Sequence, residues 1–209
     1  MAKLILIRHG RSKWNDLGQW TGWTDIELNE KGHEEAREAA EALKGLKIDK
    51  AYTSDLKRAQ QTYDEIKNIL HLDIPLVINA AIKERNYGDL AGKNKWKVKE
   101  EYGEEQFMKW RRSWDYPIPN GESLKDVYAR VIPYFETTIL PELKQGMNIL
   151  IAAHGNSLRA LVKYLENISN DEIPKLEIGT GEVYVYDIDA EGKITHKEVK
   201  TVNPDKGKV

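Results

Sequence analysis

Two short apolar runs in this chain each end in a histidine followed by a glycine. Residues 3–7 lead into Arg8-His9-Gly10, and residues 147–153 lead into His154-Gly155. Short apolar runs rich in branched residues are typical of strands buried inside a parallel sheet. Because ligands of such sheets bind beyond the carboxyl ends of the strands, the pattern predicts that both histidines lie at a ligand site.

Helix-like and strand-like patterns alternate along most of the chain. Helices are predicted for residues 28–43, from Ser54 or Asp55 to about 70, from 124 to about 140 after an N-cap at Ser123, and for 157–165; strands are predicted for 49–52 and 74–78, and a hairpin for 183–188 and 193–199. This order predicts a three-layer α/β/α sandwich with a mostly parallel central sheet. Pro133 is expected to kink the helix that contains it.

The segment from about residue 80 to 120 differs from the rest of the chain. It is polar, rich in tryptophan and arginine, and lacks long apolar periodicity. Two short helices, at 93–102 and 104–114, are predicted there as an excursion from the core. A length of 209 residues fits one globular domain, so residues 1–209 are expected to form a single domain with this helical excursion.

Composition excludes several classes of function. The formal net charge of −2 provides no global basic field for nucleic acid or an anionic membrane. The absence of cysteine excludes disulfides, thiolate metal sites and cysteine nucleophiles. No stretch approaches the roughly 20 apolar residues of a membrane span. We therefore expect a soluble, cytoplasmic protein whose partner is a small molecule rather than nucleic acid or a membrane.

The arginines near the two histidines favour phosphoryl transfer over metal binding. A strand end that reaches solvent would also accommodate Arg8 and His9, and Asn156 could simply cap a helix. A metal site needs three or more ligands with a recognisable spacing, and no such cluster accompanies these histidines. Neutral imidazole is a nucleophile, and phosphoryl transfer needs mainly alignment and charge neutralisation. Arg8 and Arg58 are expected to bind phosphate oxygens bidentately and to keep His9 neutral.

Further residues resemble those of a known family. Arg-His-Gly after the first strand is the mark of the histidine phosphatase superfamily, and the resemblance is closest to the 2,3-bisphosphoglycerate-dependent phosphoglycerate mutases. It spans about residues 4 to 188, in the segments 8–15, 21–23, 52–54, 56–59, 84–88, 110–112 and 152–161. The resemblance implies a phosphoglycerate mutase-like fold, and interconversion of 3-phosphoglycerate and 2-phosphoglycerate primed by 2,3-bisphosphoglycerate without a metal. Hydrolysis of a small phosphomonoester by the same histidines is the alternative.

The same resemblance implies roles for individual residues. His9 is expected to become the phosphohistidine, Glu84 to exchange a proton with the substrate hydroxyl, and His154 to stabilise the transferring phosphoryl group. The implied ligand-binding residues are Arg8, Gly10, Arg11, Ser12, Asn15, Thr21, Gly22, Arg58, Glu84, Arg85, Tyr87, Lys95, Arg111, Arg112, Gly155 and Asn156. A substrate with a phosphate and a carboxylate needs two cationic subsites, and Lys95 with Arg111 and Arg112 offers the second.

The sequence departs from the family pattern in places. Arg11 stands where the mutases often have glutamate. The segment 112–122 is short, whereas many mutases carry a longer insertion there that is linked to assembly. The oligomeric state therefore stays open between a monomer and a homo-oligomer. Residues from about 200 to 209, with Lys200, Lys206, Gly207 and Lys208, resemble a mobile tail that covers the site in relatives, and we expect them to act as a lid.

Overall fold

The computed structural model describes residues 1–201 and 203–204 and has a six-stranded sheet at its centre. The strands are β1 (Ala2–Arg8), β2 (Lys50–Thr53), β3 (Leu76–Ile78), β4 (Ile149–Ala153), β5 (Val183–Ile188) and β6 (Ile194–Thr201). They are ordered β3-β2-β4-β1-β5-β6. The first four in this order are parallel, while β5 runs antiparallel to both β1 and β6. The predicted mostly parallel sheet and the predicted hairpin are both confirmed.

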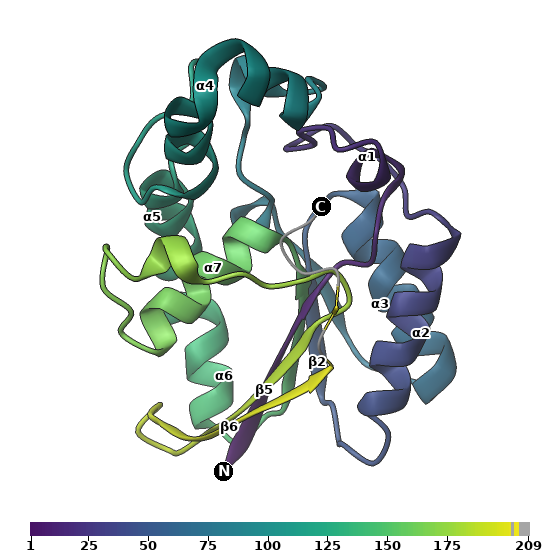
Figure 1. The fold of residues 1–209 in the computed structure, drawn as a ribbon. Coiled ribbons are helices and arrows are strands. Elements are labelled where there is room, and N and C mark those ends of the chain that lie inside the picture. Colours follow the sequence, from purple (N-terminus) through teal and green to yellow (C-terminus); the bar gives the residue numbers. More distant parts are fainter. Residues whose placement is uncertain (202, 205–209) are drawn as a thin grey trace.

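Helices cover both faces of the sheet, as predicted. They are α1 (Lys13–Asp16), α2 (Glu30–Ala42), α3 (Lys57–Leu70), α4 (Lys95–Arg112), α5 (Leu124–Tyr134), α6 (Leu140–Lys144) and α7 (Gly155–Leu165). Helices α2 and α3 lie against one face, and α5, α6 and α7 lie against the other (Figure 1). No helix in the described part of the chain has the length and apolar character needed to cross a membrane.

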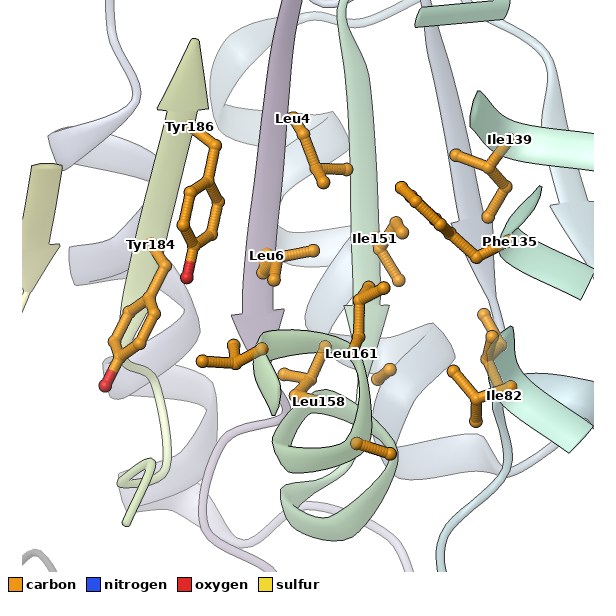
Figure 2. Close-up of a cluster of buried hydrophobic side chains, with 14 of the residues drawn as sticks. Leu4, Leu6, Ile82, Phe135, Ile139, Ile151, Leu158, Leu161, Tyr184 and Tyr186 are labelled. Carbon is orange, nitrogen blue, oxygen red and sulfur yellow. The ribbon is translucent and has the colours of Figure 1, made fainter. Parts of the chain in front are cut away.

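The central strand β1 contributes to the hydrophobic core on both sides of the sheet. Leu4 and Leu6 pack into the cluster beneath α5 and α7, which Figure 2 shows, whereas Ile5 and Ile7 pack beneath α2 and α3. All four are at most 2% exposed. Because burial of such a side chain contributes about 1.5–3 kcal/mol, this strand is a firm support for the residues that follow it.

The excursion between β3 and α5 has its own hydrophobic cluster. Helix α4 is broken at Gly103, whose φ of 82° and ψ of 160° are not helical, so the two predicted helices are confirmed. The buried members of this third cluster are Trp20, Leu90, Val98, Phe107, Trp110 and Ile118. None of them belongs to the clusters on the two faces of the sheet. The excursion therefore stands beyond the carboxyl edge of the sheet (Figure 1).

The predicted helix from 124 to about 140 is not a regular α-helix throughout. Ser123 caps it as predicted, in a reciprocal arrangement with Asp126, but the α-helical part ends at Tyr134. A π-helical stretch, Phe135–Ile139, then leads into α6. Pro133 has no N–H to donate to the preceding turn, and its carbonyl accepts a 2.7 Å bond from the Thr137 hydroxyl. The predicted irregularity is present, and it takes the form of this widened turn.

The predicted N-cap of α3 is wrong. The residue at the N-cap position is Leu56, which makes no side-chain capping bond. Ser54 Oγ accepts a bond from the Leu56 backbone N–H at 3.2 Å and lies 2.6 Å from His154 Nε2. The serine therefore connects the start of α3 to the second histidine instead of capping the helix.

Candidate active site

His9 lies directly beyond the carboxyl end of β1 and is 3% exposed. Its Nδ1 lies 2.7 Å from the Gly10 carbonyl oxygen. A carbonyl only accepts hydrogen bonds, so Nδ1 carries the proton and Nε2 keeps its lone pair. Arg58 Nε donates to this Nε2 at 3.3 Å. The lone pair of His9 therefore faces the cationic side of the site.

The environment of His9 keeps its imidazole neutral. Burial lowers the pKa of His9 well below its usual range, and the charges of Arg58 and Arg8 lower it further. The hydrogen bond to the Gly10 carbonyl acts in the opposite direction and is the smallest influence. Because only neutral imidazole has a lone pair to donate, His9 is a competent nucleophile at neutral pH.

His154 lies next to His9 because their strands are neighbours. In the parallel pair of β1 and β4, Arg8 is in register with Ala153, so the residues that follow are adjacent. The two imidazole centroids are 5.1 Å apart. Ser54 Oγ lies within hydrogen-bond distance of His154 Nε2. The Nδ1 atom of His154 is buried with no hydrogen-bond partner within the described ranges. Burial, followed by the charge of Arg58, lowers the pKa of His154 well below its usual range.

The two buried histidines predict a pH-dependent stability. In the unfolded chain both imidazoles have the ordinary pKa of 6.5, whereas both are lower in the folded protein. Their contribution to stability is therefore present above pH 6.5 and is lost as the pH falls below that value. Each buried histidine adds up to about 1.4 kcal/mol per pH unit to the slope.

We expect His9→Gln to reduce the slope of the free energy of unfolding between about pH 6 and pH 5 by about 1.4 kcal/mol per pH unit. Urea unfolding at a series of pH values measures it. Carboxylates titrate in both proteins, so the difference between the two curves isolates His9. Parallel curves would show that His9 is protonated as easily in the folded state as in the unfolded one.

Two arginines are fixed beside His9 by backbone carbonyls. Arg58 is 1% exposed and donates from Nη1 to Thr24 O at 3.0 Å and from Nη2 to Gly22 O at 2.7 Å. Burial lowers its pKa to about 10, so it stays cationic at neutral pH. Arg8 donates from Nη1 to Ile178 O at 2.6 Å, and its buried Nε has no partner among the described residues. Both guanidinium groups are held in place before any ligand binds.

Glu84 faces the same space with one carboxylate oxygen. Its Oε1 accepts three hydrogen bonds, from the Arg85 backbone N–H at 2.7 Å, the Asn156 backbone N–H at 3.1 Å and Asn156 Nδ2 at 2.9 Å. Its Oε2 has no hydrogen bond to any described residue. A Cβ at Gly155 would lie 3.6 Å from this Oε2 and 3.5 Å from Arg8 Nε. The oxygen available for proton exchange is therefore Oε2.

His9, Arg8, Arg58 and Glu84 line one cavity that opens to solvent. Its lining contains five arginines and one lysine but only two glutamates, so the cavity suits an anion. Lys95, Arg111 and Arg112 all lie on α4, and they are called the distal cationic group below. Burial, and then the charge of Arg111, lowers the pKa of Lys95 to about 7. The lining residues are Arg8, His9, Asn15, Gln19, Trp20, Thr21, Gly22, Arg58, Glu84, Tyr87, Lys95, Arg111, Arg112, Gly155, Asn156, Arg159, Glu177 and Ile178.

Five of the predicted site residues do not line this cavity: His154, described above, and Gly10, Arg11, Ser12 and Arg85. Arg11 forms an ion pair with Asp16 at 3.2 Å instead. The Ser12 hydroxyl accepts from the Asn15 backbone N–H and donates to the Asn15 side chain, so it positions a residue that does line the cavity.

Gly10 and Arg85 support the site without lining the cavity. A Cβ at Gly10 would lie 2.1 Å from the Gly32 carbonyl oxygen, so this close approach of two backbones requires glycine. Arg85 is fully buried, donates to the Trp110 carbonyl at 2.9 Å and lies 4.8 Å from the Tyr87 ring. It therefore connects the cavity wall to α4.

Sequence reasoning missed five lining residues: Gln19, Trp20, Arg159, Glu177 and Ile178. Arg159 carried a usable signal, because it is a charged residue within the apolar helix α7, three positions after Asn156. Glu177 forms an ion pair with Arg112, and nothing in the neighbouring sequence, Leu176 and Ile178, indicates this.

The expected lid lies mostly outside the described residues. Lys206, Gly207 and Lys208 fall in 205–209, which the structure does not describe. Lys200 belongs to β6, where its Nζ lies 3.0 Å from Glu198 Oε1, so it is not part of a tail. Within residues 1–201 and 203–204, no three histidine, aspartate or glutamate side chains are grouped as a metal site would require.

The parallel strands place a neutral histidine at a cavity lined by arginines. This arrangement is typical of a protein that transfers phosphoryl groups by way of a histidine. The family model of the histidine phosphatase superfamily (branch 1) matches residues 4–200, and the chain belongs to this family. Among its relatives, it is similar to the 2,3-bisphosphoglycerate-dependent phosphoglycerate mutase of Parvibaculum lavamentivorans, with 50% identity over 94% of this chain and 95% of that protein.

The similarity extends to other relatives. The phosphoglycerate mutase of Schizosaccharomyces pombe is 47% identical over 94% of each chain. The solved structure of a mycobacterial glucosyl-3-phosphoglycerate phosphatase has a TM-score of 0.81 and 24% identity over 97% of this chain and 100% of that one. That structural likeness, at so low an identity, supports the fold and carries no argument about the substrate.

Proposed function

We propose that this protein is a 2,3-bisphosphoglycerate-dependent phosphoglycerate mutase, an isomerase of glycolysis and gluconeogenesis. It interconverts 3-phosphoglycerate and 2-phosphoglycerate through a phosphohistidine at His9. The mutases of Parvibaculum and Schizosaccharomyces support this proposal because they align with nearly the whole chain. The observation that carries it is the distal cationic group, since Lys95, Arg111 and Arg112 line the same cavity as His9. A phosphoglycerate presents both a phosphate and a carboxylate, and this cavity has cations for both.

The proposal gives a role to each group near His9. Its Nε2 attacks phosphorus, and the bond from phosphorus to the substrate oxygen breaks. Glu84 Oε2 exchanges a proton with that oxygen, acting as an acid in one direction and as a base in the other. Arg8 and Arg58 neutralise the charge on the phosphoryl oxygens. His154, whose ring centroid is 5.1 Å from that of His9, is the further group that would stabilise them.

The residues of the cavity also fit the bisphosphorylated primer. Cavity-lining polar atoms that are buried without a partner among the described residues include Arg8 Nε and Thr21 Oγ1. Together with the distal cationic group they suit a ligand with several negative charges. When bound, 2,3-bisphosphoglycerate supplies the phosphoryl group that charges His9. The chain itself holds that ligand and keeps the imidazole neutral.

The proposed function predicts primer-stimulated isomerisation in the absence of free metal. The assay follows 3-phosphoglycerate to 2-phosphoglycerate in excess EDTA, with and without 2,3-bisphosphoglycerate, and measures release of inorganic phosphate in parallel. We expect isomerisation that persists in EDTA and increases with the primer, because His9 must carry a phosphoryl group to begin the cycle. Phosphate release without isomerisation would instead identify a hydrolase that passes the phosphoryl group to water.

A further inference from the structure

Arg159 is a buried cation of the cavity that the proposed chemistry does not use. It is 5% exposed and makes no ion pair with a carboxylate in the part of the chain described. Its Nη2 donates to the Ile173 carbonyl at 2.9 Å and its Nη1 to Asn156 Oδ1 at 3.0 Å. Burying a charge whose partners are all neutral oxygens is costly in free energy, which indicates that Arg159 has a functional role. The contact with Asn156 indicates what that role is.

A guanidinium group can only donate hydrogen bonds, so the atom of Asn156 that faces Arg159 must be its oxygen. The amide nitrogen of Asn156 is thereby turned the other way, where it lies 2.9 Å from Glu84 Oε1 and 2.9 Å from the Tyr87 hydroxyl. The reverse orientation would place the amide oxygen against the carboxylate and the amide N–H₂ against the guanidinium. Arg159 and the carboxylate of Glu84, which only accepts hydrogen bonds, therefore require the same orientation of the amide, and Arg159 fixes it from the side of the amide oxygen.

The orientation of this amide decides which oxygen of Glu84 is available. All three hydrogen bonds to the carboxylate end on Oε1. If the amide turned, its oxygen would face Oε1 and repel it, and only the backbone N–H groups of Arg85 and Asn156 would still hold the carboxylate. We propose that Arg159 is a positioning residue, which orients Asn156 so that Glu84 presents Oε2 to the substrate hydroxyl. This inference rests on the proposed function, because it assigns Glu84 the proton exchange.

The test compares Arg159→Met, which removes the donors at similar length, with Arg159→Lys, which keeps a donor-only cation. Lys163→Met is the matched control, because Lys163 lies on the same helix, also donates to a backbone carbonyl and does not line the cavity. We expect Arg159→Met to lower kcat by about tenfold to a hundredfold. We also expect the acidic limb of its kcat–pH profile to move upward by about one pH unit, because the carboxylate loses a donor that favours its ionised form.

Each outcome distinguishes a different role. Arg159→Lys and Lys163→Met should keep the wild-type position of the acidic limb, even where kcat falls in the lysine variant. An increase in KM with an unchanged limb in Arg159→Met would make Arg159 a substrate-binding cation and overturn the inference. If Arg159→Met does not fold, a shifted limb in Arg159→Lys would overturn it equally. Absence of isomerisation in the wild-type protein would refute the proposed function instead, before any variant is compared.

Discussion

Replacing His9 by alanine is expected to reduce kcat for the conversion of 3-phosphoglycerate to 2-phosphoglycerate by at least about 10⁴-fold. The reason is that Nε2 of His9 is the proposed nucleophile, whereas the neighbouring His154 does not line the cavity. Incorporation of labelled phosphate from 2,3-bisphosphoglycerate into the protein should disappear with the activity. The two measurements together separate loss of the nucleophile from loss of binding.

The control for this experiment is His33→Ala. His33 lies on α2, where its Nδ1 is 2.7 Å from Glu65 Oε1, and it does not line the cavity. It should retain wild-type turnover and wild-type labelling. Labelling of the His9→Ala protein at the wild-type level would move the nucleophile to another residue, and His154 would be the first to test.

Glu84→Gln is expected to lower kcat by about 10²- to 10⁴-fold with little change in KM. The amide has nearly the shape of the carboxylate, and its oxygen can still accept the bonds from Asn156 and Arg85. It cannot release or take up a proton at the substrate oxygen. Steady-state kinetics in both directions of the isomerisation measure the effect, which should be similar in each, because one group serves as acid and base.

Glu38→Gln, an exposed position on α2, is the matched control and should behave as wild type. Wild-type turnover in Glu84→Gln would assign the proton exchange to another group of the cavity. A large increase in KM with unchanged kcat would mean that Glu84 contributes to binding alone.

The sequence predicted the elements of the fold well where a single physical requirement decides the structure. The run before His9 had to be a strand buried on both faces, and the structure places it at the centre of the sheet. Prediction failed where two requirements compete for one residue. Ser54 has the chemistry of an N-cap, but its hydroxyl is engaged with His154, and that partner is 100 positions away along the chain.

The site was predictable as far as strand ends and family resemblance extend. His9, Arg58 and Glu84 do meet in one cavity, and His154 lies beside His9 without lining it. The direction of a side chain was the part that could not be predicted. Arg11 is two positions from the nucleophile and yet points to Asp16, whereas Arg159 lies in an apolar helix and lines the cavity. Which of them meets the ligand depends on packing between distant segments.

The excursion packs around its own hydrophobic cluster, separate from the clusters on the two faces of the sheet. His9 directly follows a strand of the sheet, while Lys95 and Arg111 belong to α4, whose packing centres on Trp20, Phe107 and Trp110. Changes to that cluster can reshape the end of the cavity that distinguishes one phosphate ester from another without moving the nucleophile. A fold built in this way allows a lineage to diversify its substrates while inheriting a single reaction.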